Sequence, residues 1–250
     1  MLKFFINLFC CLFITFSALG QQKPPPKQKT KAKETTKKTS DSEPPIVYKT
    51  PYGFRFGVDI SRPIIAALDE TFSGLEIVAD YRIKKNLYLA AEFGFETKET
   101  IEDNSNSTSQ GSFLRLGVNK NFYENWLDQY NEIYFGARYG LAIFEQTLNE
   151  FTTNVVNPDF PNFFPSTTET PNQTETGLQL HWVEIQIGAK VETFKNLFIG
   201  VSAAFKVALV VQDQEGFGTL YAPGFNRVFT GRTGFGFNYT LSYLIPFKKK

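Results

Sequence analysis

Apolar and polar side chains alternate one by one along most of the chain from Tyr52 onward. Successive side chains of a strand point to opposite faces, so this period of two predicts strands with one apolar and one polar face. Eight such runs occur, at 54–60, 75–83, 87–95, 114–118, 133–143, 183–191, 197–207 and 235–245. The runs approach the roughly 9–11 residues that a tilted membrane-spanning strand requires, and an even number of strands returns both ends to one side of the membrane.

The connections between these runs alternate between long and short. Four are long, at 63–73, 97–111, 147–177 and 212–230, and three are shorter, at 84–86, 122–131 and 192–196. Asn86 and Asn196 each follow a lysine in a short connection, and Asn is a residue that tight hairpin turns prefer. Long outer loops that alternate with short inner turns are typical of outer-membrane barrels.

The composition of the two faces indicates which one meets lipid. The apolar face is nearly free of charge, whereas the polar face combines Gly and Ser with balanced Arg, Glu and Asp. Side chains just fill the interior of an eight-stranded barrel, so opposite charges there must pair. A soluble ligand-binding barrel, the alternative, would turn the polar face outward. The prediction is an all-β fold: a single eight-stranded antiparallel up-and-down transmembrane β-barrel.

Aromatic residues gather at the turn ends of these runs. They are Tyr81, Tyr88, Phe122, Tyr123, Trp126, Tyr130, Phe194, Phe198, Tyr243 and Phe247. We expect them to form girdles at the level of the lipid headgroups. The overall composition, with 27 Phe, 11 Tyr and 18 Gly against a single Met, also favours strands over helices. The net charge of +1 gives no reason to expect a nucleic-acid partner.

The first twenty residues are typical of an export signal. Lys3 precedes an apolar run over 4–16, and small residues before Gln21 predict cleavage there. The run is too short to span a bilayer as a helix. Cys10 and Cys11 lie within it, so the exported chain would contain no thiol and no disulfide, cysteine-bound metal or cysteine nucleophile.

The segment 21–45 is predicted to be a disordered linker rich in Lys and Pro. It contains no apolar side chain large enough to build a core, and its lysines repel one another. It is either a solvated spacer or a cationic tether to anionic cell wall or lipid. The domain organisation is therefore a signal peptide over 1–20, this linker, and a barrel over 46–250.

Candidate chemistry is sparse in the barrel sequence. His181 is the only histidine of the chain, and no residue pattern matches a metal or cofactor site. His181 and Glu184 point to opposite faces of a regular strand, but the apolar phase slips where Leu178, Leu180 and Trp182 precede Val183. A bulge there would bring His181 to Glu184, as a lipid hydrolase would need; otherwise His181 is a polar rim residue. We assign no catalytic, cofactor-binding or metal-binding residue.

The loop 147–177 is the best candidate for a binding surface. Phe160, Phe163 and Phe164 lie among prolines that stiffen the chain. Exposed aromatic side chains on such a loop either grip a glycan or a protein partner, or pack over the barrel mouth as a lid. The glycines at 234 and 236 belong to the last strand, where they would make room for large inward neighbours.

Five stretches resemble a family of small bacterial envelope proteins catalogued only as a domain of unknown function. They are YGFRFGVD at 52–59, YLAAE at 88–92, NFYENW at 121–126, PGFNR at 223–227 and GFNYTLSYLIP at 236–246. The resemblance covers residues 52–247. It implies an outer-membrane barrel and brings no activity or site residues with it.

These observations favour a non-enzymatic outer-membrane barrel, a structural or surface-interaction scaffold with long external loops. Outer-membrane lipid is its expected surrounding, the loop 147–177 its expected contact with a surface ligand or protein, and a monomer its expected state. A narrow transport pore and an outer-membrane lipid-modifying enzyme are the alternatives. Eight strands usually leave no open channel, which disfavours the pore.

Overall fold

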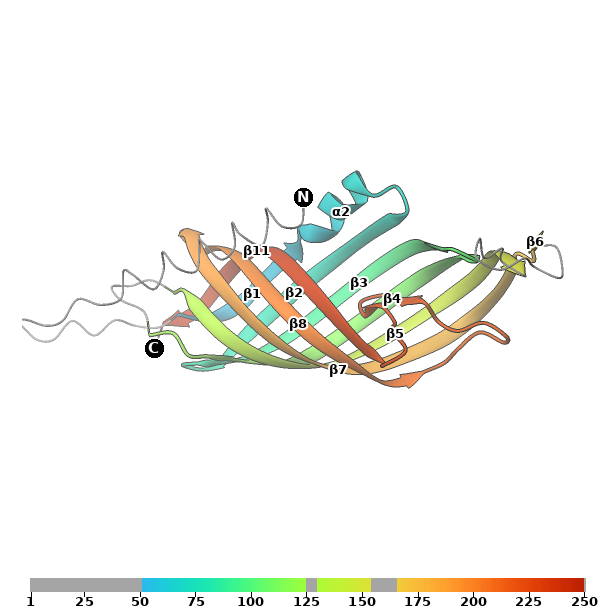
Figure 1. Ribbon diagram of the computed structural model, residues 1–250. Helices are drawn as coiled ribbons and strands as arrows, with labels where there is room; N and C mark the ends of the chain where they lie inside the picture. The colour runs from blue at the N-terminus through green and yellow to red at the C-terminus, as the bar shows by residue number, and fades with distance from the viewer. Residues whose placement is uncertain (1–50, 125–129, 154–165, 250) are drawn as a thin grey trace, which may run out of the picture. The chain divides into compact units, whose positions relative to one another are not determined.

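The computed structural model describes residues 51–124, 130–153 and 166–249. The predicted signal peptide and linker lie outside these residues, so both stay predictions. Within the described part, eight long antiparallel strands form a closed ring (Figure 1). They are β1 Pro51–Asp59, β2 Phe72–Lys84, β3 Leu87–Glu102, β4 Ser105–Asn121, β5 Glu132–Thr153, β7 Gln173–Phe194, β8 Leu197–Val211 and β11 Thr233–Lys249.

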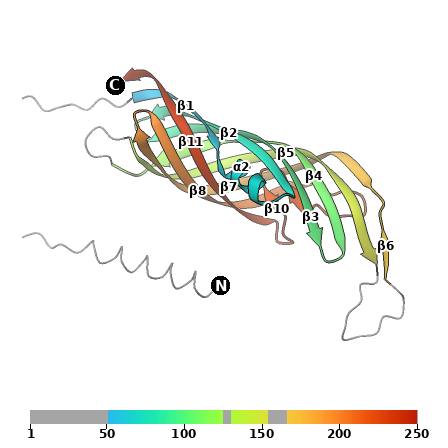
Figure 2. The ribbon, with the colours of Figure 1, turned by 90° about the horizontal axis from the view of Figure 1, so that it is seen from above.

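The ring closes because the first and last strands pair with each other. Each long strand pairs with its neighbours in chain order, and β1 pairs with both β2 and β11. Pro51 lies opposite Lys249, so the two ends of the barrel chain lie at the same end of the barrel (Figure 2). The predicted up-and-down barrel of eight strands is confirmed: seven of the eight alternating runs lie within one strand, and the first, 54–60, ends one residue beyond β1.

The charged face of the strands is the interior of the barrel. Arg115 and Glu76 are fully buried, whereas Ile185, Val201 and Phe237 on the opposite face are 50%, 46% and 66% exposed. An apolar exterior around a charged interior inverts the arrangement of a soluble barrel and matches a membrane-spanning one. The predicted orientation of the two faces is therefore confirmed.

The two ends of the barrel differ in their connections. At the end that carries both barrel termini, β2 joins β3 and β7 joins β8 through tight turns at Asn86 and Asn196, and Asn196 adopts a φ of 66°. Asn tolerates this left-handed conformation better than most residues, which explains its place in the turn. We call the opposite end, which carries the longer connections, the outer end.

A short helix replaces the first of the predicted long loops. Helix α2, Ser61–Leu68, follows β1 directly. The Asp59 carboxylate accepts hydrogen bonds from the backbone and hydroxyl of Ser61 at 2.9 and 2.7 Å. Pro63 lies in the first turn, where its missing N–H leaves no helical hydrogen bond unmade. A helix of 8 residues is too short to give a clear period in the sequence.

Strands rather than loops occupy much of two other predicted connections. Over 97–111, β3 continues to Glu102 and β4 begins at Ser105. Over 147–177, β5 continues to Thr153, the short strand β6 Thr167–Glu169 pairs with it, and β7 begins at Gln173. Thr and Asn fill these stretches, so the apolar alternation that marks a membrane strand is absent there.

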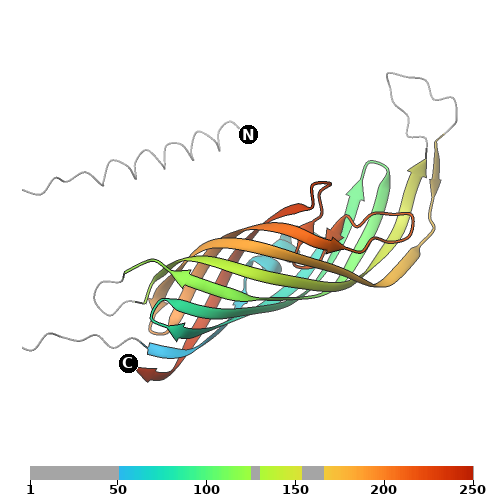
Figure 3. The same cartoon turned by 90° about the horizontal axis from the view of Figure 1, so that it is seen from below.

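These extensions form a sheet that rises beyond the barrel wall. We call it the raised sheet: residues 99–108, 147–153, 167–169 and 173–178. Neighbouring strands β2 and β8 do not follow it, because β2 starts opposite Lys98 and β8 ends opposite Leu180. The green and yellow strands that project from one end in Figure 3 belong to it.

The last predicted outer loop, 212–230, folds partly into the barrel. It contains the short hairpin of β9 Tyr221–Ala222 and β10 Asn226–Arg227. Ala222 and Phe225 are fully buried, and Thr219 and Tyr221 nearly so. We call residues 219–226 the plug, and this inward course corrects the prediction of a wholly external loop.

The aromatic girdle is confirmed only in part. Tyr81, Phe194 and Phe247 are exposed on the outer face, but Tyr88 and Phe198 are buried inside the barrel. Each is next in sequence to a lipid-facing residue, so the alternation of the strand turns it inward. Both rings contact the Arg55 guanidinium. Trp126 lies outside the described residues.

Candidate functional site: the closed interior and the outer mouth

Arg115 on β4 lies at the centre of the charges inside the barrel. Its guanidinium contacts Glu76, lies 2.8 Å from Glu92 and lies 3.7 Å from Glu184. These carboxylates come from β2, β3 and β7, so a single side chain connects strands on different sides of the ring. A buried charge is tolerated only when partners of opposite sign surround it, and Arg115 has three.

A second cluster fills the end of the barrel near the tight turns. The Arg55 guanidinium lies 3.0 Å from Asp80 and 2.7 Å from Glu132. Lys190 also contacts Asp80. Arg82 lies 3.8 Å from Glu132. The cluster joins β1, β2, β5 and β7 across the interior.

Helix α2 supplies a third set of contacts toward the outer end. Arg62, although it lies on the helix, points into the barrel and is 3.0 Å from Glu96 and 3.4 Å from Glu76. The amide of Asn238 on β11 donates to Asp59 at 2.7 Å and to Glu76 at 3.2 Å. The helix therefore closes part of the ring through a buried cation.

Little free volume remains between these clusters. The interior cavity lined by Glu76, Asp80, Glu92 and Arg138 measures about 30 Å³. That volume corresponds to about one water molecule. At this level the interior therefore consists of paired charges in contact.

The plug closes the barrel above these charges. The Tyr221 hydroxyl and the backbone N–H of Gly224 both donate to Oε2 of Glu96, at 2.7 and 2.9 Å. From the other side, the buried Lys206 ammonium donates to the carbonyl of Gly224 at 2.6 Å. A carboxylate on β3 and an ammonium on β8 thus hold the tip of the plug between them.

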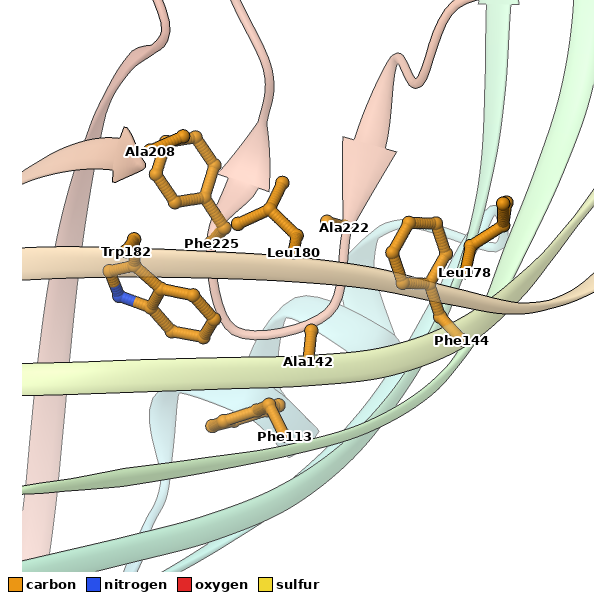
Figure 4. Packing of buried hydrophobic residues seen from close by; sticks show 9 residues of the cluster. All are labelled: Phe113, Ala142, Phe144, Leu178, Leu180, Trp182, Ala208, Ala222 and Phe225. Carbon is orange, nitrogen blue, oxygen red and sulfur yellow. The ribbon is translucent and has the colours of Figure 1, made fainter. Parts of the chain in front are cut away.

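An apolar cluster forms the contact between the plug and the barrel wall. Figure 4 shows Ala222 and Phe225 of the plug facing side chains of β4, β5, β7 and β8. The wall residues are Phe113, Ala142, Phe144, Leu178, Leu180, Trp182 and Ala208. The Trp182 and Phe225 rings meet edge to face, with centroids 5.9 Å apart. Burial of this apolar surface holds the plug against the wall.

Glycines make the room that the plug needs. A Cβ at Gly234 would lie 3.2 Å from the Phe225 ring, and a Cβ at Gly236 would lie 2.9 Å from the Lys206 ammonium. Gly224 has a φ of 72°, and a Cβ there would overlap the Phe113 ring. The expectation that glycines of the last strand accommodate large inward neighbours is therefore confirmed.

The structure separates the two residues of the hydrolase hypothesis. His181 lies on the outer face, where its Nδ1 is 2.7 Å from the Tyr139 hydroxyl. Glu184 lies inside and accepts hydrogen bonds from Trp182 at 3.0 Å and Gln186 at 2.6 Å. The ladder irregularity beside His181 adds Leu209 to β8 and leaves β7 alternating. The proposed bulge in β7 was therefore wrong, and the pair does not form.

The apparent irregularity in the apolar alternation before Val183 has another cause. Leu178, Leu180 and Trp182 point inward in step with Glu184, and all three pack against the plug side of the barrel. The strand keeps its period, but its interior changes from charged to apolar at the level of the plug. This change in the inward-facing residues is a sequence signal that could have revealed the plug.

A salt bridge anchors the connection from α2 to β2. Lys98 on β3 donates to Asp69 at 2.7 Å and to the Thr71 hydroxyl at 2.6 Å. The hydrogen bond from Lys98, together with those from Thr71, lowers the pKa of Asp69 to about 2. Asp69 is therefore charged at neutral pH and ties the connection to the base of the raised sheet.

The remaining candidates yield no further site. Phe160, Phe163 and Phe164 lie outside the described residues, so their role in the 147–177 loop stays a prediction. Among residues 51–124, 130–153 and 166–249, no cluster of His, Cys, Asp and Glu is arranged to hold a metal ion. In the same ranges, no helix has the length and apolar character needed to cross a membrane.

A ring of eight antiparallel strands with an apolar exterior and a charged, closed interior defines the class of transmembrane β-barrel proteins. The chain belongs to the family described as "Domain of unknown function (DUF6048)", whose model matches residues 1–250. The family resemblance read from the five sequence stretches is thereby confirmed.

Comparison with solved structures adds a structural likeness. The crystal structure of Ail, the attachment invasion locus protein of Yersinia pestis, has a TM-score of 0.38 and 9% sequence identity to this chain. The likeness covers 77% of this chain and 96% of that one. No curated protein matches the sequence.

Proposed function

We propose that this protein is a monomeric, non-enzymatic barrel of the bacterial outer membrane that presents the raised sheet as a surface for interaction. The observation that carries the proposal is the difference between the two parts of the barrel along its axis. Paired charges and the plug fill the interior, while four strands continue past the apolar belt into the aqueous phase. A scaffold needs a stable wall and an accessible platform, and both are built here from the same strands.

The outer face of the raised sheet is polar and well ordered by side-chain hydrogen bonds. Asn149 donates to Asn106 at 3.1 Å and to Thr108 at 2.8 Å, and Asn106 in turn donates to Glu99 at 2.7 Å. Thr147 and Thr174 are hydrogen-bonded at 2.8 Å. Short polar side chains fixed in place suit recognition of a hydrated surface more than insertion into lipid.

The pore alternative has less support than the scaffold. Transport would require the Arg115, Arg55 and Arg62 clusters to separate, which would leave charges unpaired inside the barrel. The lipid-modifying enzyme has lost its supporting observation, because His181 and Glu184 lie on opposite sides of the barrel wall.

Orientation and location can be tested with single cysteines, since the exported chain is predicted to contain no thiol. Asn104→Cys lies at the tip of the raised sheet, and Lys195→Cys lies in the tight turn at the opposite end. A membrane-impermeant maleimide on intact cells should label the first variant and spare the second, with both labelled after lysis. Equal labelling of the two on intact cells would contradict the proposal.

Interaction can be tested by a photo-crosslinking side chain placed at Asn149 or, as the control, at Ile185 in the apolar belt. We expect protein adducts on intact cells from Asn149 and only lipid adducts from Ile185. The purified wild-type barrel should show no conductance in planar bilayers. Steady single-channel currents, or no adduct from Asn149 or its neighbours on the raised sheet, would refute the scaffold.

A further inference from the structure

A pocket opens at the outer mouth between the inner face of the raised sheet and the chain on either side of the plug. Its volume is about 580 Å³, which lies within the range of small-molecule sites. Its apolar walls are Leu148, Phe151, Phe217, Leu220, Val228 and Phe229. Val228 also packs against the apolar cluster that holds the plug, so the pocket adjoins that cluster.

Backbone hydrogen bonds fix the walls of the pocket. Val228 donates to the carbonyl of Leu220 at 2.9 Å, and Thr152 donates to the carbonyl of Asn104 at 2.8 Å. One wall is thereby continuous with the plug hairpin and the other with the tips of β3, β4 and β5. A pocket on such elements is formed before a ligand arrives, which lowers the entropic cost of binding.

One cation stands at the rim of this apolar pocket. Arg227 on β10 pairs with Glu102 on β3, with Nη2 of the guanidinium 2.8 Å from Oε1 of the carboxylate. The Arg227 side chain is 59% exposed, while that of Glu102 is 31% exposed. The guanidinium carbon lies 5.5 Å from the centre of the Phe229 ring, so charge and ring face the same space.

We propose that this pocket binds a small amphipathic anion: a carboxylate that Arg227 receives, attached to one aromatic ring that the phenylalanines enclose. An arginine has five donors in a fork that matches a carboxylate, and the 59% exposure of the Arg227 side chain leaves its guanidinium accessible to a ligand. Phe151, Phe217 and Phe229 provide edges and faces for a ring. The ligand site does not depend on the proposed scaffold function, because it would operate in any setting that leaves the mouth open.

Charge complementarity favours an anion over a cation at this rim. Glu102 is the less exposed partner of the pair and already faces Arg227, so a cationic ligand would meet the guanidinium first. An anionic ligand would instead compete with Glu102 for Arg227. Loss of the Arg227 charge should therefore weaken binding of an anion, whereas loss of the Glu102 charge should strengthen it.

The test uses the full barrel in nanodiscs of zwitterionic lipid, with binding measured by ligand-observed NMR against empty nanodiscs. The probes are 3-phenylpropionate and its neutral analogue 3-phenylpropionamide. The wild type should bind the acid more tightly than the amide. Arg227→Gln should weaken acid binding about tenfold, the loss expected for one charge-assisted hydrogen bond, and leave amide binding unchanged. Glu102→Gln should strengthen acid binding.

Arg232→Gln is the matched control, because it removes the same charge from an exposed residue of the same segment that does not line the pocket. It should leave both affinities unchanged. Phe229→Ala should weaken acid and amide alike, and migration of unboiled protein on gels checks that each variant is folded. Equal wild-type affinity for acid and amide, absence of binding, or equal effects of Arg227→Gln and Arg232→Gln would overturn the proposal.

Discussion

The Tyr221 hydroxyl donates a 2.7 Å hydrogen bond to Oε2 of Glu96, although the two residues are 125 positions apart in the chain. The same oxygen accepts the backbone N–H of Gly224, and the second oxygen lies 3.0 Å from Arg62. One carboxylate therefore joins the plug, the barrel wall and helix α2. Wall and plug are therefore parts of a single cooperative structure.

Tyr221→Phe should lower the free energy of unfolding by about 1.5–3 kcal/mol, the range for a lost hydrogen bond to a charged group. Glu96→Leu should lower it by about 3–5 kcal/mol, because it also leaves the buried Arg62 without one of its carboxylates. The double variant should lose less than the sum of both, since the two residues share one interaction. Urea unfolding of the refolded barrel measures all three. Strict additivity would show that the contact contributes nothing to stability.

Val201 tests whether the apolar face meets lipid. It is 46% exposed at mid-strand, so lipid can close around a shorter side chain and Val201→Ala should be mild. Val201→Arg should destabilise the barrel by about 2–4 kcal/mol, the range for a cation near the bilayer midplane. Heat-modifiability on gels and urea unfolding give the comparison. Equal damage from both substitutions would mean that Val201 is packed against protein.

Glu184 tests the interior charge network. Glu184→Leu should reduce stability by about 3–5 kcal/mol, because it removes an acceptor of Trp182 and Gln186 and one carboxylate facing Arg115. Glu184→Gln, the matched control, keeps an acceptor and should do less harm. Arg115 is the ion-pair partner of Glu184, at 3.7 Å. Normal stability of Glu184→Leu would show that water already solvates this face.

Gly224 and Gly216 form a matched pair for testing the plug. Both have a positive φ, 72° and 75°, but a Cβ at Gly216 meets nothing within 4 Å, whereas a Cβ at Gly224 overlaps Phe113. Both alanine variants share the backbone strain, of order 1 kcal/mol. Gly224→Ala should in addition displace the plug and expose Ala222→Cys to a small maleimide in the purified barrel. If Ala222→Cys is equally protected in both backgrounds, the plug does not depend on this close approach.

Strand positions and the lipid-facing side could be predicted because both follow from local periodicity. The face on which a mid-strand residue such as Ile185 or Val201 lies can be read from its neighbours two positions away, because they share that face. Balanced charge on the other face also predicted paired ions inside the barrel. Which carboxylate pairs with which cation could not be predicted from the sequence. Arg115 contacts carboxylates from three other strands, and their heights in the barrel depend on strand register.

The plug and the raised sheet escaped prediction for physical reasons of a different kind. The segment 212–230 lacks periodicity, and its inward course depends on Glu96 and Lys206, which lie far away in the sequence. The raised sheet is rich in Thr, Asn, Ser and Glu and lies outside the apolar belt, where the regular apolar alternation of a membrane strand is not required. Tyr88 and Phe198 were assigned to the girdle by residue type, although alternation within their own strands placed them inside.

Because the strands differ in length, the extent of strand pairing varies around the barrel. β1 has 9 residues and pairs with β2 only from Phe54 to Val58, whereas β5 and β7 have 22 residues each and pair from Glu132 to Leu148 of β5. Amide protons along β5 and β7 should therefore be the last to exchange with deuterium, and those of β1 the first. A pulling force would open the wall at the seam between β1 and β2, leaving an open curved sheet that runs from β2 through β3, β4, β5, β7, β8 and β11 to β1.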